Sequence, residues 1–191
     1  MPLKQGLGLL LGRMRLLAAL LLGRSAAAEA ACDDLLLRWP AHPHLLATRA
    51  HLRAQRGDAA AAAGDLRELV RLAPTRSAGD WFNLGFVLEQ MDKPEEAEPA
   101  FRQALALDDK LDRAWYGLGL ALIRLQRLDE AAAALKRNTE LQPMSPYGWY
   151  QLARLHWDRQ QPDETRRIIA HLKGFEPKIA AQLERETGLV G

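Results

Sequence analysis

The sequence contains a single cysteine, Cys32, and no uncharged span long enough to cross a membrane. One thiol cannot form an intramolecular disulfide, so a fold held by a disulfide framework is excluded. A membrane-spanning helix needs about 18–20 apolar residues, whereas the N-terminal apolar run 16–22 is bounded by Arg15 and Arg24. We therefore expect no membrane insertion.

The charge balance is nearly even. There are 26 basic and 24 acidic residues, a net charge of +2, and no block of like charge. Such a chain has no long-range field to attract nucleic acid or anionic lipid. We expect no nucleic-acid partner, and polyanion binding would need a local patch.

Sequence signatures of enzymes are also missing. The chain has no glycine-rich phosphate loop, no paired-histidine zinc helix, no nucleophile elbow and no carboxylate-rich metal loop. His42, His44 and His51 lack the Cys or carboxylate spacing of a metal site, so we interpret them as turn and surface residues. We expect no catalytic residues, no cofactor and no metal.

Alanine and leucine dominate the composition, and runs of Val, Ile and Thr are missing, which favours an all-α fold. A period of about 34 residues is visible in the stretches WFNLGFVLEQ (81–90), WYGLGLALIR (115–124) and WYQLARLHWD (149–158). In each stretch a Trp, a Leu three residues later and a small residue after that share one helical face. We expect Trp81, Trp115 and Trp149 in the core of the repeats.

The second half of each unit predicts a second, antiparallel helix. Pro94 and Pro162 precede acidic pairs, as in the first turn of a helix. Pro143 and Pro177 are expected to end the helical segments, and Pro99 should bend the helix that contains it.

This pattern resembles the tetratricopeptide repeat, in which stacked helix pairs form an α-solenoid. Arg49 and Arg53 depart from it, because the pattern has Leu and an aromatic residue there. We predict about five repeats and a C-terminal capping helix. The predicted division is an N-terminal extension 1–8, degenerate repeats 9–42 and 43–77, repeats 78–111, 112–145 and 146–179, and the cap 180–191.

The N-terminus has a second interpretation. Its basic start, the apolar run 16–22 and the small residues that follow are features of a secretory signal. Arg13 and Arg15 interrupt the apolar stretch, so we favour repeat helices and a cytoplasmic location, with export to the periplasm as the alternative. Met14 is an alternative start.

The resemblance implies a function on the concave face, where peptides or partner helices bind. We predict that this groove is formed by Phe82, Asn83, Phe86, Glu89, Tyr116, Leu120, Ile123, Arg124, Tyr150, Arg154 and Trp157. Some family members hold a carboxylate with a clamp of Lys, Asn and Arg residues. In this sequence only Asn83 and Arg113 are candidates for such a clamp. An apolar segment with an acidic group near Arg154 or Arg124 is the expected ligand.

The expected function is a non-enzymatic scaffold that binds a protein or peptide. The alternatives are an exported assembly factor and the regulatory subunit of a separate transferase. The groove could also be filled by the chain's own C-terminal segment.

Overall fold

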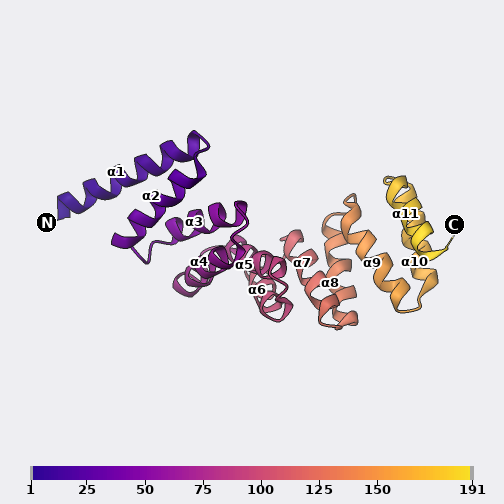
Figure 1. Ribbon diagram of the computed structural model, residues 1–191. Coiled ribbons are helices and arrows are strands. Elements are labelled where there is room, and N and C mark those ends of the chain that lie inside the picture. Colours follow the sequence, from indigo (N-terminus) through magenta and orange to yellow (C-terminus); the bar gives the residue numbers. More distant parts are fainter. Residues whose placement is uncertain (1, 190–191) are drawn as a thin grey trace. The chain divides into compact units, whose positions relative to one another are not determined.

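The computed structural model describes the backbone of residues 2–189 and the side chains of residues 8–189. Over this range the chain is helical, without a strand (Figure 1). The eleven helices of the described range are α1 (Pro2–Leu21), α2 (Ser25–Arg38), α3 (Pro43–Gln55), α4 (Ala59–Leu72), α5 (Ala78–Gln90), α6 (Pro94–Leu107), α7 (Asp112–Arg124), α8 (Leu128–Leu141), α9 (Pro146–Asp158), α10 (Pro162–Lys173) and α11 (Pro177–Thr187). The all-α prediction is confirmed.

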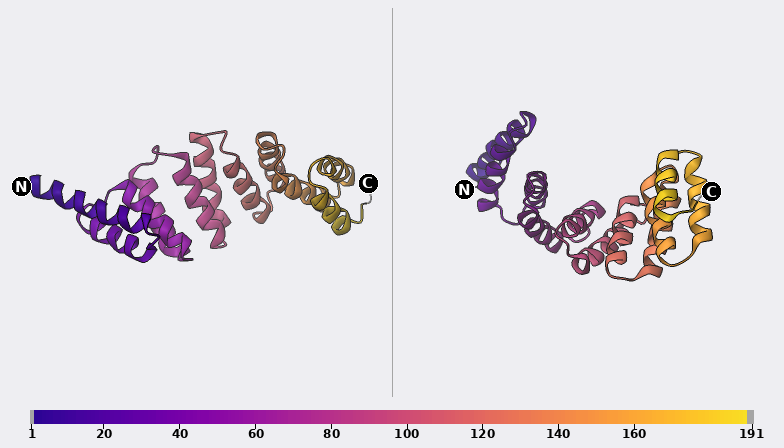
Figure 2. Two further views of the ribbon diagram at one scale, coloured as in Figure 1. Left: turned by 90° about the horizontal axis from the view of Figure 1, so that it is seen from above. Right: turned by 45° about the vertical axis from the view of Figure 1, so that its right-hand side comes forward.

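The helices form two compact units, one from α1 to α5 and one from α6 to α11, with the division between Lys93 and Pro94. Within each unit, helices that follow one another in sequence pack side by side. They run back and forth, as Figure 2 shows from two further directions. In the second unit α11 also contacts α9, so the last three helices pack together.

Proline marks the start of several helices. Pro94 begins α6 and Pro162 begins α10, as predicted. Pro177 does not merely end a segment, because it is the first residue of α11. Pro99 lies inside α6, which continues through it to Leu107.

The turn between the two helices of each pair recurs with the same backbone conformation. Positive φ angles occur at Gly23 (65°), Gly57 (87°), Asp92 (57°), Gln126 (60°) and Gln160 (58°). These positions are evenly spaced, apart from a single extra residue between Gly57 and Asp92. The repeat is therefore present in the backbone of the first two helix pairs, where its sequence pattern is degenerate.

The repeated tryptophans are half-buried, which corrects the prediction that they fill the core. The leucine three residues after each Trp is buried instead. Each indole Nε1–H donates a hydrogen bond to a carbonyl oxygen of the preceding loop: Trp81 to Pro74 (2.7 Å), Trp115 to Asp109 (2.8 Å) and Trp149 to Pro143 (2.9 Å). Each tryptophan therefore fixes the loop before its helix through this hydrogen bond.

Glycines allow close helix packing in the second unit. A Cβ atom on Gly117 would lie 2.5 Å from the ring of Phe101, which is buried on α6. A Cβ atom on Gly119 would lie 2.7 Å from the side chain of Leu135 on α8. Since real Cβ contacts are longer, α7 can approach both neighbours only where it lacks side chains.

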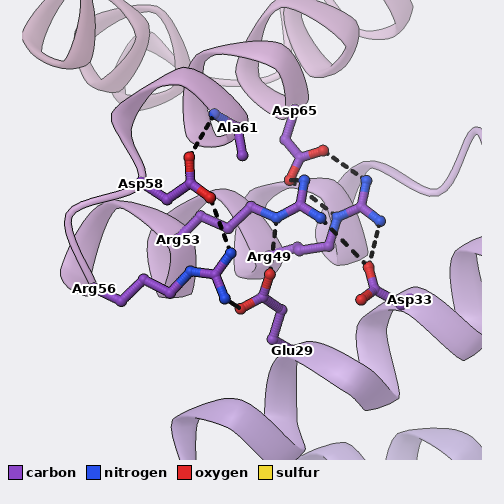
Figure 3. A network of polar contacts seen from close by, with 8 residues as sticks. All are labelled: Glu29, Asp33, Arg49, Arg53, Arg56, Asp58, Ala61 and Asp65. Atoms are coloured by element: carbon purple, nitrogen blue, oxygen red, sulfur yellow. Dashed lines mark hydrogen bonds and ion pairs between the residues drawn. The ribbon is translucent and has the colours of Figure 1, made fainter. Parts of the chain in front are cut away.

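Arg49 and Arg53 lie in a network of charges between α2, α3 and α4 (Figure 3). Arg49 donates to both carboxylate oxygens of Asp65, at 2.6 and 3.0 Å, and to Asp33 at 2.7 Å. Arg53 donates to Glu29 at 3.0 Å and to Asp65 at 2.9 Å. Ion pairs thus replace the apolar contacts of the repeat pattern, and α4 still packs on α5 in the same unit.

The C-terminal helix α11 agrees with the predicted cap. Ala180 and Leu183 are buried on one of its faces. Gly188 follows the helix in the left-handed conformation, which only glycine adopts without strain.

The described residues contain neither a membrane-spanning helix nor a metal-binding cluster. None of the helices formed by residues 2–189 is long and apolar enough to cross a bilayer. The side chains of residues 8–189 include no group of three His, Cys, Asp or Glu residues that could hold a metal ion.

Candidate partner-binding site

The predicted groove residues of the second unit lie on α7 and α9. The opposite faces of these helices are buried in the core through Leu118, Leu122, Leu152 and Leu155. Of the predicted residues, Tyr116, Leu120, Ile123 and Tyr150 are half-buried, and Arg124, Arg154 and Trp157 are exposed. The buried leucines fix α7 and α9 in the core, and the predicted groove residues remain outside it.

A small pocket lies between the C-terminal ends of α7 and α9. Its volume is about 280 Å³, and it is lined by Ile123, Gln126, Leu128, Gln151, Arg154, Leu155 and Asp158. Small-molecule sites usually measure about 300–1,000 Å³, so this pocket is better matched to one or two side chains of a partner. Its lining combines three aliphatic side chains with one cation and one carboxylate.

Tyr150 is connected to α11 by hydrogen bonds. Its hydroxyl donates to the carboxylate of Glu186, with distances of 2.9 and 3.0 Å to the two oxygens. Gln182 Nε2 donates to the same carboxylate at 2.8 Å and lies 3.3 Å from the tyrosine hydroxyl. The carboxylate of Glu186, on the capping helix, thus lies beside the predicted groove residue Tyr150.

Arg154 lies next to this cluster. Its guanidinium carbon is 5.9 Å from the centre of the Tyr150 ring, within the range of a cation–π interaction. Hydrogen bonds from Gln182 and Tyr150, together with the charge of Arg154, hold the pKa of Glu186 below its ordinary value. Hydrogen bonding to Tyr150 and the nearby Glu186 charge raise the pKa of Arg154, so both groups are charged at neutral pH.

Tyr116 occupies the equivalent position on α7. Burial raises the pKa of its hydroxyl, and a hydrogen bond with Gln151 of α9 partly offsets this effect. Polar contacts therefore connect Tyr116 of α7 with α9, and Tyr150 of α9 with α11.

The remaining predicted residues lie on α5 in the first unit. The rings of Phe82 and Phe86 stack with a centroid distance of 6.1 Å and an interplanar angle of 24°. Phe86 is 49% exposed, Asn83 is exposed and Glu89 is half-buried. Phe82 and Phe86 therefore form an aromatic pair on α5, within the first unit.

Glu186 and Gln182 were missed because residues 180–191 were expected only to cap the last repeat, so no groove residue was predicted there. The helices α5, α7 and α9 begin at equal intervals, but α11 begins at Pro177 instead of the expected position 180. Extrapolation from Tyr150 by one period leads to Glu184, which instead pairs with Lys173 at 2.8 Å. Pro177 was the available signal for the early start of α11, since proline is favoured at the first helical position.

Comparison with protein families identifies one match. Residues 82–143 match a family model described as the tetratricopeptide repeat. No curated protein sequence gives a significant match.

Solved structures with the same fold include YrrB, described as a TPR protein with an unusual peptide-binding site. It is 16% identical, has a TM-score of 0.81, and the alignment covers 89% of this chain and 88% of YrrB. A MamA protein is 19% identical with a TM-score of 0.79 and coverage of 97% and 100%. MamA from Desulfovibrio magneticus RS-1, residues 41 to the end, is 20% identical with a TM-score of 0.77 and coverage of 95% and 97%.

These likenesses establish the fold, and the family match establishes the repeat type in the middle of the chain. Residues 82–143 are tetratricopeptide repeats, and the chain has the fold of a tetratricopeptide repeat protein.

Proposed function

We propose that this protein is a non-enzymatic scaffold that binds a peptide or helix of a partner on the surface formed by α7, α9 and α11. The observation that carries the proposal is the pocket between α7 and α9, with apolar lining from Ile123, Leu128 and Leu155 and a charged rim. Tetratricopeptide repeats are generally protein-interaction modules without catalytic activity, and YrrB is described as having a peptide-binding site.

The lining defines the kind of ligand. An apolar side chain of the partner would enter the pocket and contact Ile123 and Leu155. Arg154 on the rim would pair with a carboxylate of the partner, and Asp158 would disfavour a second acid on its own side. Buried apolar anchors contribute most of the binding energy in such interfaces, while rim charges set orientation.

Peptide display tests this proposal and does not require the natural partner. Random peptides selected on the wild-type protein should share an apolar residue flanked by an acid. Leu120→Glu or Arg154→Ala should reduce their binding by about tenfold or more, as expected for loss of an anchor or a charge pair. Leu107→Glu, at an exposed leucine of α6 in the same unit, is the matched control and should bind normally.

Circular dichroism of each variant must show unchanged helix content. Peptides that bind Leu120→Glu and Arg154→Ala as well as the wild type would overturn the proposal. Phe86→Glu tests the α5 surface in a separate assay, the capture of the natural partner from a cell extract. We expect it to reduce capture of the natural partner from a cell extract without unfolding the protein.

We further infer the division into repeats 9–42, 43–77, 78–111, 112–145 and 146–179, followed by the cap 180–191. The left-handed turns at Gly23, Gly57, Asp92, Gln126 and Gln160 support it, because one such turn falls inside each proposed repeat.

A further inference from the structure

Helix α1 has two apolar faces, of which only one is used inside the first unit. Leu16 and Ala19 are buried, and a Cβ atom on Gly12 would lie 2.4 Å from Leu35 of α2. Gly12, Leu16 and Ala19 follow the i, i+4, i+7 spacing of one helical face. This face packs closely on α2.

The second face carries large apolar side chains that no other described part of the first unit covers. Leu10, Met14, Leu17 and Leu21 follow the spacing i, i+4, i+7, i+11, and each is more than half exposed. Residues 10–22 contain seven of the 13 exposed large apolar side chains among the described residues. An apolar patch concentrated in this way marks an interaction surface.

Basic residues flank the stripe. Successive residues of a helix are about 100° apart, so Arg13 and Arg15 project on opposite sides of Met14. Both arginines are exposed, as is Arg24, and none of the three has an ion-pair partner among the described residues. Residues 1–28 contain four basic and no acidic residues, although the whole chain has a net charge of only +2.

The neighbouring helix does not cancel this local charge. Asp34 and Arg38 of α2 line the cleft beside α1, together with Arg15. The charges of Asp34 and Arg38 offset one another, so the N-terminal segment 1–28 retains its excess of positive charge.

We propose that the outer face of α1 binds the surface of a membrane that contains anionic lipids. The helix would lie in the plane of the interface, with Leu10, Met14, Leu17 and Leu21 among the acyl chains and Arg13 and Arg15 at the headgroups. An apolar stripe between cations is the pattern of interfacial helices. A second copy of the chain fits less well, because pairing two such faces would bring their cations together without a carboxylate from either helix.

Co-sedimentation of the full-length protein with lipid vesicles tests the proposal. Binding is expected with vesicles of phosphatidylcholine and phosphatidylglycerol, but not with phosphatidylcholine alone. Leu17→Glu should abolish binding. Arg13→Gln with Arg15→Gln should weaken it about 25-fold, since each cation near an anionic surface contributes about fivefold.

The matched control is Met144→Glu, which introduces the same charge at an exposed residue between α8 and α9 and should bind like the wild type. Absence of binding by the wild type, equal binding to both vesicles, or equal binding by Leu17→Glu would each overturn the proposal. A dimer in light scattering that Leu17→Glu dissociates would assign this face to a second copy instead. A mature protein that begins after Ala28 or Ala30 in intact-mass measurement would show that the segment is removed, which also overturns it.

Discussion

The hydroxyl of Tyr150 donates a hydrogen bond to the carboxylate of Glu186, which lies 36 residues later in the chain, at 2.9 and 3.0 Å from its two oxygens. Tyr150 belongs to α9 and Glu186 to the capping helix α11. Glu186 is largely exposed, so the interaction is screened by water and contributes little to stability. In the proposed binding surface it occupies the position of the acid that a partner would bring.

Glu186→Gln is therefore expected to strengthen the binding of apolar, acidic peptides severalfold, because it removes a competing carboxylate beside Arg154 and Tyr150. Fluorescence anisotropy with a displayed peptide measures this change, and Glu184→Gln, whose carboxylate pairs with Lys173, is the control. Unchanged or weaker binding by Glu186→Gln would show that the carboxylate does not compete with the ligand.

Gly117→Ala should destabilise the protein by about 1–3 kcal/mol, the usual cost of overpacking a core. The added Cβ would lie 2.5 Å from the buried ring of Phe101. Gly64→Ala, inside α4, would meet nothing within 4 Å and should stabilise by about 0.5–1 kcal/mol through helix propensity. Urea unfolding of both variants checks the prediction, and the same sign for both would contradict it.

Asp65→Ala should lower the free energy of unfolding by about 2–3 kcal/mol. Breaking a fully buried pair costs ~3–5 kcal/mol, but here Arg49 keeps its ion pair with Asp33 and Arg53 keeps its ion pair with Glu29. The Asp65 side chain is only 6% exposed and binds both arginines. Glu68→Ala breaks an exposed pair with Arg71 on the same helix and should have little effect. Equal unfolding midpoints for the two variants would count against a structural role of the network.

Gln160→Gly should stabilise the protein by about 0.5–1 kcal/mol, since relief of left-handed strain exceeds the added entropy of the unfolded chain. Gln160 has a φ of 58° in its turn. The reverse change at the equivalent turn, Gly57→Gln, should destabilise by about 1 kcal/mol. Thermal unfolding of the two variants should therefore shift in opposite directions.

The Cys32 thiol should react slowly in the native protein. Burial raises its pKa from 9.0 to about 11, with a partial decrease from Arg49 and a further increase from Asp33. At pH 8 the thiolate fraction is then about 100-fold lower than in the unfolded chain. Alkylation by iodoacetamide with and without denaturant measures the difference, and equal rates would refute it.

The same shift affects stability at high pH. The folded protein holds the thiol proton more tightly than the unfolded chain. The contribution of this proton to the free energy of unfolding is therefore complete below pH 9 and is lost as the pH rises toward 11. Cys32→Ala should remove this part of the pH dependence in urea unfolding between pH 9 and 11.

Local patterns were sufficient to predict the helices and their succession. Helix starts at Pro94 and Pro162, and the helix end at Gly188, were predicted because proline and glycine act through backbone dihedrals that depend on few neighbours. The face of α7 with Tyr116, Leu120 and Ile123 follows from helical spacing alone. These properties require no knowledge of which helices touch.

The repeat period, the all-α class and the residues that face away from the core on α7 and α9 could be predicted without the structure. Three features became apparent from the packing of the helices: Arg49 and Arg53 meet Asp65, the repeated tryptophans are half-buried, and Glu186 reaches Tyr150. A period describes where a side chain points on its own helix, but ion pairs, burial and the contacts of α11 depend on which helices lie next to one another and on the distance between them.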